Sequence, residues 1–357
     1  MRPFSVLAIL TLLTLPGLAP ANAESLSILD GRGQTVTLDR PARSVVTIPI
    51  PSAAILMALH GGPEVIAAMH PASLAAIKGS ILERIYPAAA QIRTDIIAGG
   101  TFNPNVETVL TLKPDAVVQW ASQGPDLIAP LESAGLKVIG VNYGRQQDSE
   151  TILAILGKLI GREEKAARIV ALHKKVQADI EAVASQIADS EKPKVIYFLR
   201  FKDSFRPSGR GTYNDFYINL VGGRNAADLE GLRTDVNAEQ VAAWNPEIIL
   251  LGNFDAATPA DVYANPLFAD VSAVKNKRVY KMPLGGYRWD PPSHESPLTW
   301  MWLAEMVHGD RFDIDLSTEM RRFYREVYGY DLTQADIAQI LQVPLNGGAA
   351  GYRDLAR

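Results

Sequence analysis

The sequence predicts an α/β protein with two lobes, each built on a mostly parallel sheet, joined by a single long helix. Three features carry this prediction. Short apolar runs alternate with helical patterns, as in sheets that helices cover on both faces. One long amphipathic stretch divides this alternation into two halves. A motif of the first half, which begins at Asn105, returns in the second half at Asn237.

The expected strands fall into two groups, one for each lobe. A hairpin is predicted within residues 25–37, because Asp30-Gly31 is a typical two-residue turn between antiparallel strands. The first group of strands is expected at residues 44–48, 65–69, 116–120 and 137–141. The second group is expected at residues 194–199, 248–251 and 278–281.

A long helix is predicted between the two groups. From residue 162 to residue 189, apolar residues such as Ile169 and Ile187 recur every three or four positions and form one stripe. Gly161 ends the preceding helix, and Pro193 prevents this one from continuing. We therefore expect lobes at residues 24–160 and 191–357, a connecting helix at 161–190, and small relative rotations of the lobes. One continuous sheet crossed by this helix is the alternative.

The first 23 residues predict export. Arg2 precedes an apolar run from Phe4 to Leu15, and Ala21-Asn22-Ala23 has the small residues of a cleavage site. The run is shorter than the roughly 20 residues of a membrane-spanning helix. Because no Cys is available for lipidation after cleavage, we expect a soluble periplasmic monomer that begins after Ala23.

The composition excludes several classes of protein. Hydrophobic residues make up 47% of the chain and charged residues 21%, which is a globular balance. The formal net charge of −4 supplies no basic field for nucleic acid. Because Cys is absent, disulfides, thiolate metal sites and thiol nucleophiles are excluded.

The repeated motif combines helix capping with turn chemistry. The corresponding pairs are Asn105 and Asn237, Glu107 and Glu239, Pro114 and Pro246, and Asp115 and Glu247. In each copy an Asn caps a short helix, an acid lies in the first turn, and Pro with an acid introduces a buried strand. Capping and turn formation account for all of these residues, so a purely structural role for both glutamates stays open.

These motifs together resemble the substrate-binding proteins of ABC importers for iron complexes, haem and corrinoids. The resemblance rests on the two Asn-x-Glu helices, the opening strand at 43–48, the helical junction at 156–166 and the Gly-Gly-Arg-Asn segment at 222–225. It covers roughly residues 25–303 and implies two lobes bridged by one helix, with the ligand in the cleft. It also implies a permease dimer and its ATPase as partners. In this family the Glu of each repeated helix meets permease arginines, which implies that role for Glu107 and Glu239.

The loops after the predicted strands supply a candidate ligand site, because ligands of open α/β sheets bind beyond the carboxyl ends of the strands. Aromatic rings and guanidinium groups dominate these loops and suit a flat or anionic chelate. The candidate ligand-binding residues are Trp120, Tyr143, Arg200, Arg210, Tyr213, Tyr287, Arg288, Trp289 and His294. Surface ion pairs for the arginines and core packing for the aromatic residues are the alternatives.

A ferric siderophore fits these loops best. Haem, with Tyr213, Tyr287 or His294 as axial ligand, a corrinoid, and molybdate or tungstate are the alternatives. A bare metal ion is disfavoured because the five His form no helical pair, and no resident cofactor is expected. A chelatase or hydrolase is disfavoured because the chain has no nucleophile elbow and no phosphate loop.

The resemblance to this family does not extend beyond residue 303. Two added helices are expected at 317–328 and 333–341, followed by a loose Gly-rich end from residue 346.

Overall fold

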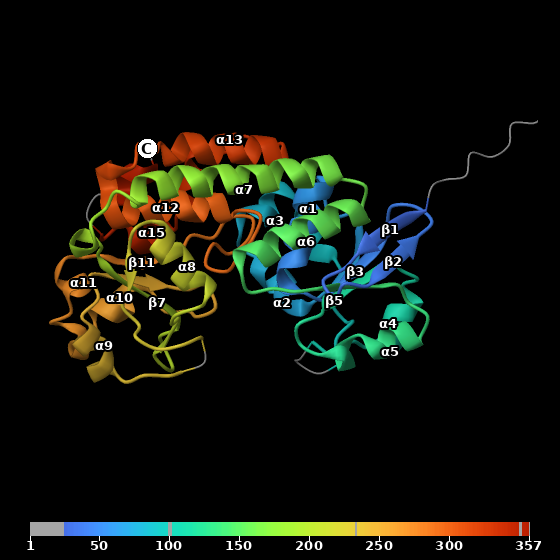
Figure 1. The fold of residues 1–357 in the computed structure, drawn as a ribbon, viewed down its shortest axis with the longest axis horizontal. Helices are drawn as coiled ribbons and strands as arrows, with labels where there is room; N and C mark the ends of the chain where they lie inside the picture. The colour runs from blue at the N-terminus through green and yellow to red at the C-terminus, as the bar shows by residue number, and fades with distance from the viewer. Residues whose placement is uncertain (1–24, 99–101, 233, 350–351, 357) are drawn as a thin grey trace, which may run out of the picture.

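The computed structural model describes residues 25–98, 102–232, 234–349 and 352–356, so the predicted signal segment 1–23 lies outside the described residues. Two lobes lie side by side, and helix α7 (Glu163–Ala184) runs along both of them (Figure 1). Helix α12 (Ser296–His308) packs against α7, and α13 (Leu316–Tyr328) packs against α12. Within the described ranges, no helix has the length and hydrophobicity needed to cross a membrane.

The N-terminal lobe contains a four-stranded parallel sheet in the order β4-β3-β5-β6. Its strands are β3 (Val45–Thr47), β4 (Ile66–Met69), β5 (Ala116–Trp120) and β6 (Val138–Val141). A hairpin of β1 (Leu26–Leu29) and β2 (Thr35–Leu38) precedes them. The helices of this lobe are α1 (Ile50–His60), α2 (Pro71–Ile77), α3 (Ile81–Ile85), α4 (Val106–Thr111), α5 (Ala129–Ser133) and α6 (Gln146–Leu159).

The C-terminal lobe contains a five-stranded sheet in the order β11-β10-β7-β8, with β9 also paired to β7. Only the pairing of β7 with β8 is antiparallel within this described sheet. Its strands are β7 (Lys194–Arg200), β8 (Arg206–Pro207), β9 (Arg224–Asn225), β10 (Ile248–Leu251) and β11 (Val279–Lys281). The other helices are α8 (Tyr213–Leu220), α9 (Ala238–Trp244), α10 (Pro259–Tyr263), α11 (Ser272–Lys275), α14 (Gln334–Ile340) and α15 (Val343–Asn346). Short 3₁₀ helices lie at Pro87–Gln91, Pro125–Leu127, Asp189–Glu191, Pro266–Phe268, Gly309–Arg311 and Tyr352–Ala356.

Neighbouring side chains of each strand point to opposite faces of the sheet, as strand geometry requires. In β5, Val118 packs into the large apolar cluster that contains α1, α6 and α7, whereas Val117 packs into a smaller cluster with α4 and α5. The strand β7 behaves in the same way, with Tyr197 in the large cluster and Phe198 in a separate one. The large cluster therefore continues from one lobe through α7 into the other.

The repeated motif forms the same structure in both lobes, as predicted. The side chain of Asn105 accepts a hydrogen bond from the first turn of α4 at 3.2 Å, and Asn237 does the same in α9 at 2.8 Å. Asp115 accepts two backbone N–H bonds just before β3, at 2.8 and 3.0 Å, and Glu247 accepts one at the start of β7, at 3.0 Å. Each acid therefore ties the end of the motif to the first strand of the main sheet in its own lobe.

The predicted fold class is confirmed, and the predicted strands agree with the observed ones to within two residues at each end. The connecting helix is shorter than the predicted span 161–190, since α7 ends at Ala184. Ile187 continued the apolar spacing, but it packs from beyond the helix end, close to Gly222. The lobe boundaries at 24–160 and 191–357 stay a prediction.

The chain after residue 316 corrects one expectation. The two predicted helices exist as α13 and α14. The predicted loose end is wrong for Tyr352, which is 1% exposed. Its hydroxyl donates to the carbonyl of Leu341 at 2.8 Å and accepts from the indole of Trp302 at 3.1 Å. An aromatic residue anchored in this way holds the end of the chain against the C-terminal lobe.

Candidate ligand site between the lobes

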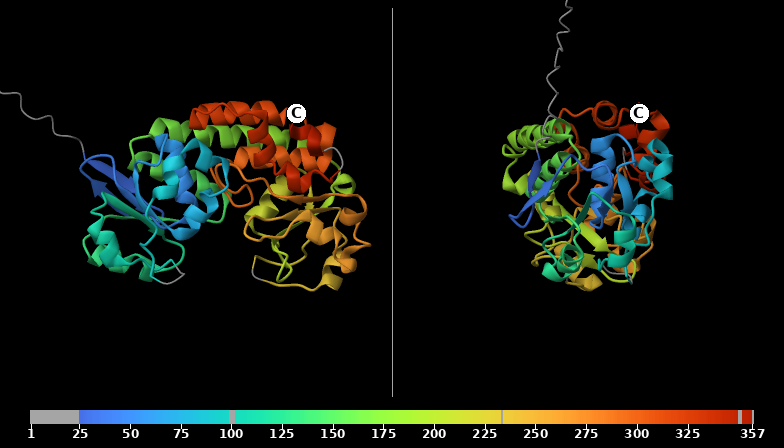
Figure 2. Two further views of the ribbon diagram at one scale, coloured as in Figure 1. Left: turned by 180° about the vertical axis from the view of Figure 1, so that it is seen from behind. Right: turned by 90° about the vertical axis from the view of Figure 1, so that its right-hand side faces the viewer.

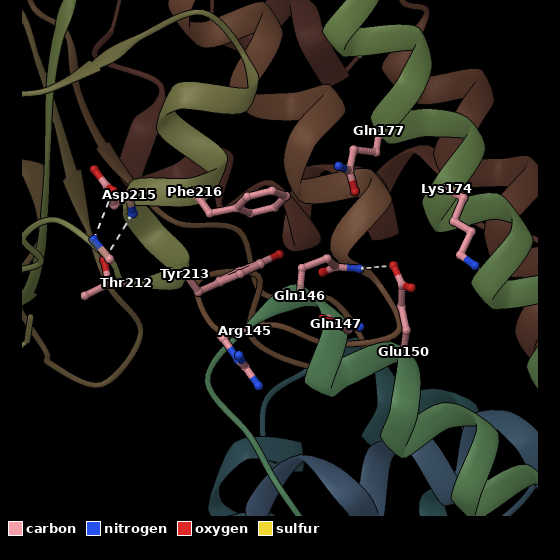
Figure 3. A pocket seen from close by; sticks show the side chains of 11 residues that line it. Arg145, Gln146, Gln147, Glu150, Lys174, Gln177, Thr212, Tyr213, Asp215 and Phe216 are labelled. Atoms are coloured by element: carbon pink, nitrogen blue, oxygen red, sulfur yellow. Dashed lines mark hydrogen bonds between the residues drawn. The ribbon is translucent and has the colours of Figure 1, made fainter.

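A pocket of about 610 Å³ lies between the lobes next to α7 (Figure 3). The start of α6 in the N-terminal lobe, the middle of α7 and the start of α8 in the C-terminal lobe line it. The rings of Tyr213 and Phe216 stack with centroids 5.9 Å apart and give the pocket an apolar side. Arg145, Lys174 and Glu150 give it charged groups of both signs.

One buried acceptor in this pocket has no partner within the described residues. The amide nitrogen of Gln146 donates to Glu150 at 3.1 Å and lies 2.8 Å from Nδ1 of His173. Its Oε1 is buried and receives no hydrogen bond from the described part of the chain. Figure 3 shows this side chain beside Tyr213. A ligand that offers an N–H or O–H group here would satisfy an otherwise unpaired acceptor.

An aromatic row lines the ends of the strands of the N-terminal lobe. It consists of His70, Phe102, Trp120 and Tyr143, with successive ring centroids 4.9, 5.8 and 5.5 Å apart. His70, Trp120 and Tyr143 lie at or just beyond the carboxyl ends of β4, β5 and β6, which meet at one edge of a parallel sheet. Nε1 of Trp120 is buried with no hydrogen-bond partner in the described ranges.

Two arginines flank a phenylalanine at the corresponding edge of the C-terminal lobe. The guanidinium of Arg288 lies over the ring of Phe254, 4.5 Å from its centroid, in a cation–π contact. The exposed Arg200, at the end of β7, donates to the carbonyl of the same Phe254. Nη1 of Arg288 is buried and makes no hydrogen bond to any described residue. A buried N–H group without an acceptor costs free energy, so an oxyanion that reached this group would stabilise it.

The two walls meet at Tyr143. Its hydroxyl donates to the carbonyl of Pro292 in the C-terminal lobe at 2.7 Å. Burial raises the pKa of Tyr143 well above its ordinary value, and the nearby phenols of Tyr287 and Tyr213 add to the rise. Burial likewise raises the pKa of Tyr213 and of Tyr287. All three phenols therefore stay protonated at neutral pH and act as hydrogen-bonding groups.

The structure brings together six of the nine predicted ligand residues. Tyr143, Tyr213, Tyr287 and Arg288 interact at the junction of the lobes, Trp120 stacks on Tyr143, and Arg200 joins them through Phe254. Arg210 is exposed and pairs with Asp228 and, at 2.7 Å, with Glu230. It matches the ion-paired alternative.

Trp289 and His294 are fully buried, with the indole nitrogen of Trp289 and Nε2 of His294 bonded inside the protein, and their ligand contacts stay a prediction. The indole of Trp289 donates to Glu295 at 2.8 Å. Nε2 of His294 lies 2.6 Å from the hydroxyl of Tyr328. Their polar atoms thus hold the loop between β11 and α12 in place. Its pattern of rings and prolines resembled a binding loop, and Tyr287, Arg288 and the carbonyl of Pro292 do reach the junction.

Glu107 and Glu239 are exposed in the first turns of α4 and α9. In Figure 1 these two helices lie on the side of their lobes opposite α7. Each carboxylate is next to a helix N-terminus, which favours negative charge. The two acids therefore occupy equivalent positions on the two lobes.

Sequence reasoning missed several residues of the site. Phe254 and Arg145 follow strands directly, so their positions gave the same signal as the chosen residues. Phe102, Gln146 and Lys174 gave none, because only the tertiary fold brings them to the junction. Within the described ranges, no group of three or more His, Asp or Glu residues is arranged to hold a metal ion.

The buried histidines predict a loss of stability in acid. His173 on α7 lies between Gln146 and the carbonyl of His294, and Trp300 packs on its ring. Burial lowers the pKa of His173 to about 4 and that of His294 to about 3. In the unfolded chain the pKa of an imidazole is about 6.5. Between about pH 6.5 and pH 4 the unfolded chain therefore binds more protons than the folded protein, and the free energy of unfolding decreases as the pH falls.

We expect the free energy of unfolding in urea to drop by about 2–4 kcal/mol between pH 7 and pH 5. In the variant His173→Gln the slope of this free energy against pH should become shallower. An unchanged slope in the variant would show that His173 does not contribute to the loss of stability in acid.

The matched family agrees with this geometry. The family model described as periplasmic binding protein matches residues 67–284, which is more than half of the chain. The chain belongs to the periplasmic binding protein family of ABC importers. A solved periplasmic solute binding protein of Veillonella parvula is 32% identical to this binding protein, with a TM-score of 0.84. The match covers 91% of this chain and 99% of the other.

Two curated relatives carry named ligands. The Fe(3+)-citrate-binding protein YfmC of Bacillus subtilis is 26% identical over 187 residues, which are 51% of this binding protein and 58% of the relative. The molybdate-binding protein MolA of Haemophilus influenzae is 23% identical over 268 residues, which are 67% and 74% of the two chains.

Proposed function

We propose that this periplasmic binding protein captures a ferric siderophore between its lobes and delivers it to an ABC permease. The observation that carries the proposal is the pairing of an aromatic row on one lobe with Arg288 of the other, whose buried Nη1 has no partner among the described residues. Rings pack on the organic body of a chelate, and guanidinium groups bind its anionic oxygens.

The hydrogen bonds of the junction suit a ligand that brings its own metal coordination. The hydroxyls of Tyr143 and Tyr213 donate to the carbonyl of Pro292 and to the hydroxyl of Ser296, at 2.7 and 2.9 Å, so both are engaged within the protein. A preformed chelate needs no protein ligand, because its iron is already coordinated. The ferric-citrate relative supports an iron complex as the cargo.

Molybdate is the second candidate, favoured by the likeness to the molybdate-binding relative. A small oxyanion needs a closely fitted pocket of hydrogen-bond donors. The junction offers aromatic rings instead, with Trp120 stacked on Tyr143 and Arg288 over Phe254, and these suit a larger organic body. Enzymatic turnover is not proposed, because the matched family consists of transporter substrate-binding proteins.

We propose further that Glu107 and Glu239 dock the protein onto the permease. Two exposed carboxylates at equivalent places on the two lobes fit a permease whose two subunits each present a guanidinium group. The protein acts in the periplasm in this proposal, after cleavage behind Ala23, and works as a monomer with the permease dimer and its ATPase.

The proposal is tested by titrating tryptophan fluorescence with ferric enterobactin, ferric citrate, a ferric trihydroxamate, haem, cyanocobalamin and molybdate. Trp120 stacks on Tyr143 within the site and serves as the reporter. We expect saturable quenching by at least one ferric siderophore. Binding of molybdate alone, or of none of these compounds, would refute the siderophore assignment.

Arg288→Gln is expected to weaken binding of that siderophore by about 10–100-fold, because a hydrogen bond to a charged group contributes roughly 1.5–3 kcal/mol. Arg210→Gln is the matched control, since the guanidinium of Arg210 is already paired with Asp228 and Glu230 within the C-terminal lobe. Its affinity should equal that of the native protein. Equal weakening in both variants would point to a general loss of positive charge instead of a specific contact.

A further inference from the structure

The C-terminal helices connect the two lobes a second time, independently of α7. In the N-terminal lobe, α14 packs against α3 and α13 packs against α1. Arg84 of α3 donates to the carboxylate of Asp336 and, at 2.7 Å, to the side chain of Gln339, both on α14. The amide of Gln339 in turn donates to the carbonyl of Gly79 at 3.1 Å. The right-hand view of Figure 2 shows these helices beside the N-terminal lobe.

The same segment is fastened to the C-terminal lobe next to the site. The backbone of Leu284, at the start of the loop that carries Tyr287 and Arg288, donates to the carbonyl of Ile340 at 2.8 Å. Asn346 bonds both the N–H and the carbonyl of Lys281 in β11, at 2.7 and 2.9 Å. These bonds tie α14 and α15 to the strand and the loop that precede the site.

Tyr328 of α13 is the point where the two attachments meet. Its hydroxyl donates to the carboxylate of Glu295 at 2.6 Å. The same hydroxyl oxygen lies 2.6 Å from Nε2 of His294. Its ring lies 6.4 Å from that of Tyr86 in the N-terminal lobe, in edge-to-face geometry. The loop passes so close to this cluster that a Cβ on Gly286 would lie 2.3 Å from the Tyr328 hydroxyl. Only glycine fits there.

We propose that α13 to α15 form a second bridge that restricts rotation of the lobes about α7 and positions Tyr287 and Arg288. If α7 alone joined the lobes, they could rotate relative to one another about the axis of this helix. A second connection through other helices prevents that rotation. Arg84 and Tyr328 are the positioning residues of this bridge. The restriction of motion is independent of the ligand, while the effect on Tyr287 and Arg288 rests on the proposed function.

The absence of Cys allows a direct test in the full chain. Spin labels are attached to Thr111→Cys at the end of α4 and Ala243→Cys in α9, both exposed positions on separate lobes. Double electron–electron resonance then gives the distribution of distances between the lobes. We expect one narrow distribution for the otherwise native protein. In Arg84→Ala combined with Gln339→Ala it should become about twofold broader.

Arg93→Ala is the matched control, because it removes an exposed ion pair with Asp95 inside the N-terminal lobe. It should leave the distribution narrow. Tyr328→Phe keeps the ring and removes the hydrogen bonds, and it is expected to loosen the loop so that tryptic cleavage after Arg288 accelerates. The proposed second bridge would be refuted if the distance distribution of the double variant were as narrow as that of the native protein and trypsin cleaved Tyr328→Phe after Arg288 at the native rate. These results do not depend on whether any siderophore binds.

Discussion

Reversing the charge at both docking positions, in Glu107→Lys combined with Glu239→Lys, is expected to abolish uptake of the ligand in cells. Each lysine would face a permease guanidinium that the glutamate is proposed to bind, so attraction becomes repulsion at two places at once. Both side chains are exposed and neither lines the interlobe pocket, and the affinity of the purified protein for its ligand should therefore stay unchanged. Uptake of radioactive iron as the siderophore measures the first effect, and fluorescence titration measures the second.

The matched control reverses two exposed acids on α7, in Glu164→Lys combined with Glu181→Lys. The change in net charge is the same, but the positions lie along α7 instead of at the starts of α4 and α9. We expect normal uptake. A docking variant that transports as well as this control would remove Glu107 and Glu239 from the mechanism.

Replacing Glu295 by Ala should lower the free energy of unfolding by about 3–5 kcal/mol. This carboxylate is fully buried and accepts bonds from the backbone of Gly286, the indole of Trp289 and the hydroxyl of Tyr328. Burial raises the pKa of Glu295, and these hydrogen bonds oppose the rise. Alanine would leave several buried donors unsatisfied at once, each costing roughly 1–3 kcal/mol. Urea unfolding at pH 7 measures the change.

Glu295→Gln is the conservative variant, since an amide oxygen still accepts part of these bonds, and it should lose less than half as much stability. Glu163→Ala is the surface control, because this acid is exposed at the start of α7. Its effect should stay within about 0.5 kcal/mol. A change of that small size in Glu295→Ala would show that the loop is not held by this carboxylate.

Much of the fold was predictable because, in the strands and at the helix starts, the local preferences of the residues agree with their places in the tertiary structure. The strands are continuous apolar runs, as buried parallel strands must be, and the two Asn caps have the residue types that capping requires. The end of α7 was missed because Ile187 satisfies the helical spacing and is buried for another reason. Periodicity reports burial, and it does not distinguish burial within a helix from burial just beyond it.

The site was predictable only in part, for a different reason. Tyr143, Tyr287 and Arg288 lie in loops after strands, Tyr213 opens α8, and these segments converge. Trp289 and His294 lie in the same loop with the same composition, but Tyr328 and Glu295 draw them inward. No local pattern separates the two groups, since the difference depends on α13, which follows later in the chain.

Native mass spectrometry of the protein purified directly from the periplasm tests the central claim most directly. The account predicts one complex whose added mass equals an organic ligand with one ferric ion, which is lost in Arg288→Gln and kept in Arg210→Gln. An added mass equal to molybdate, or a metal ion without an organic ligand, would contradict it.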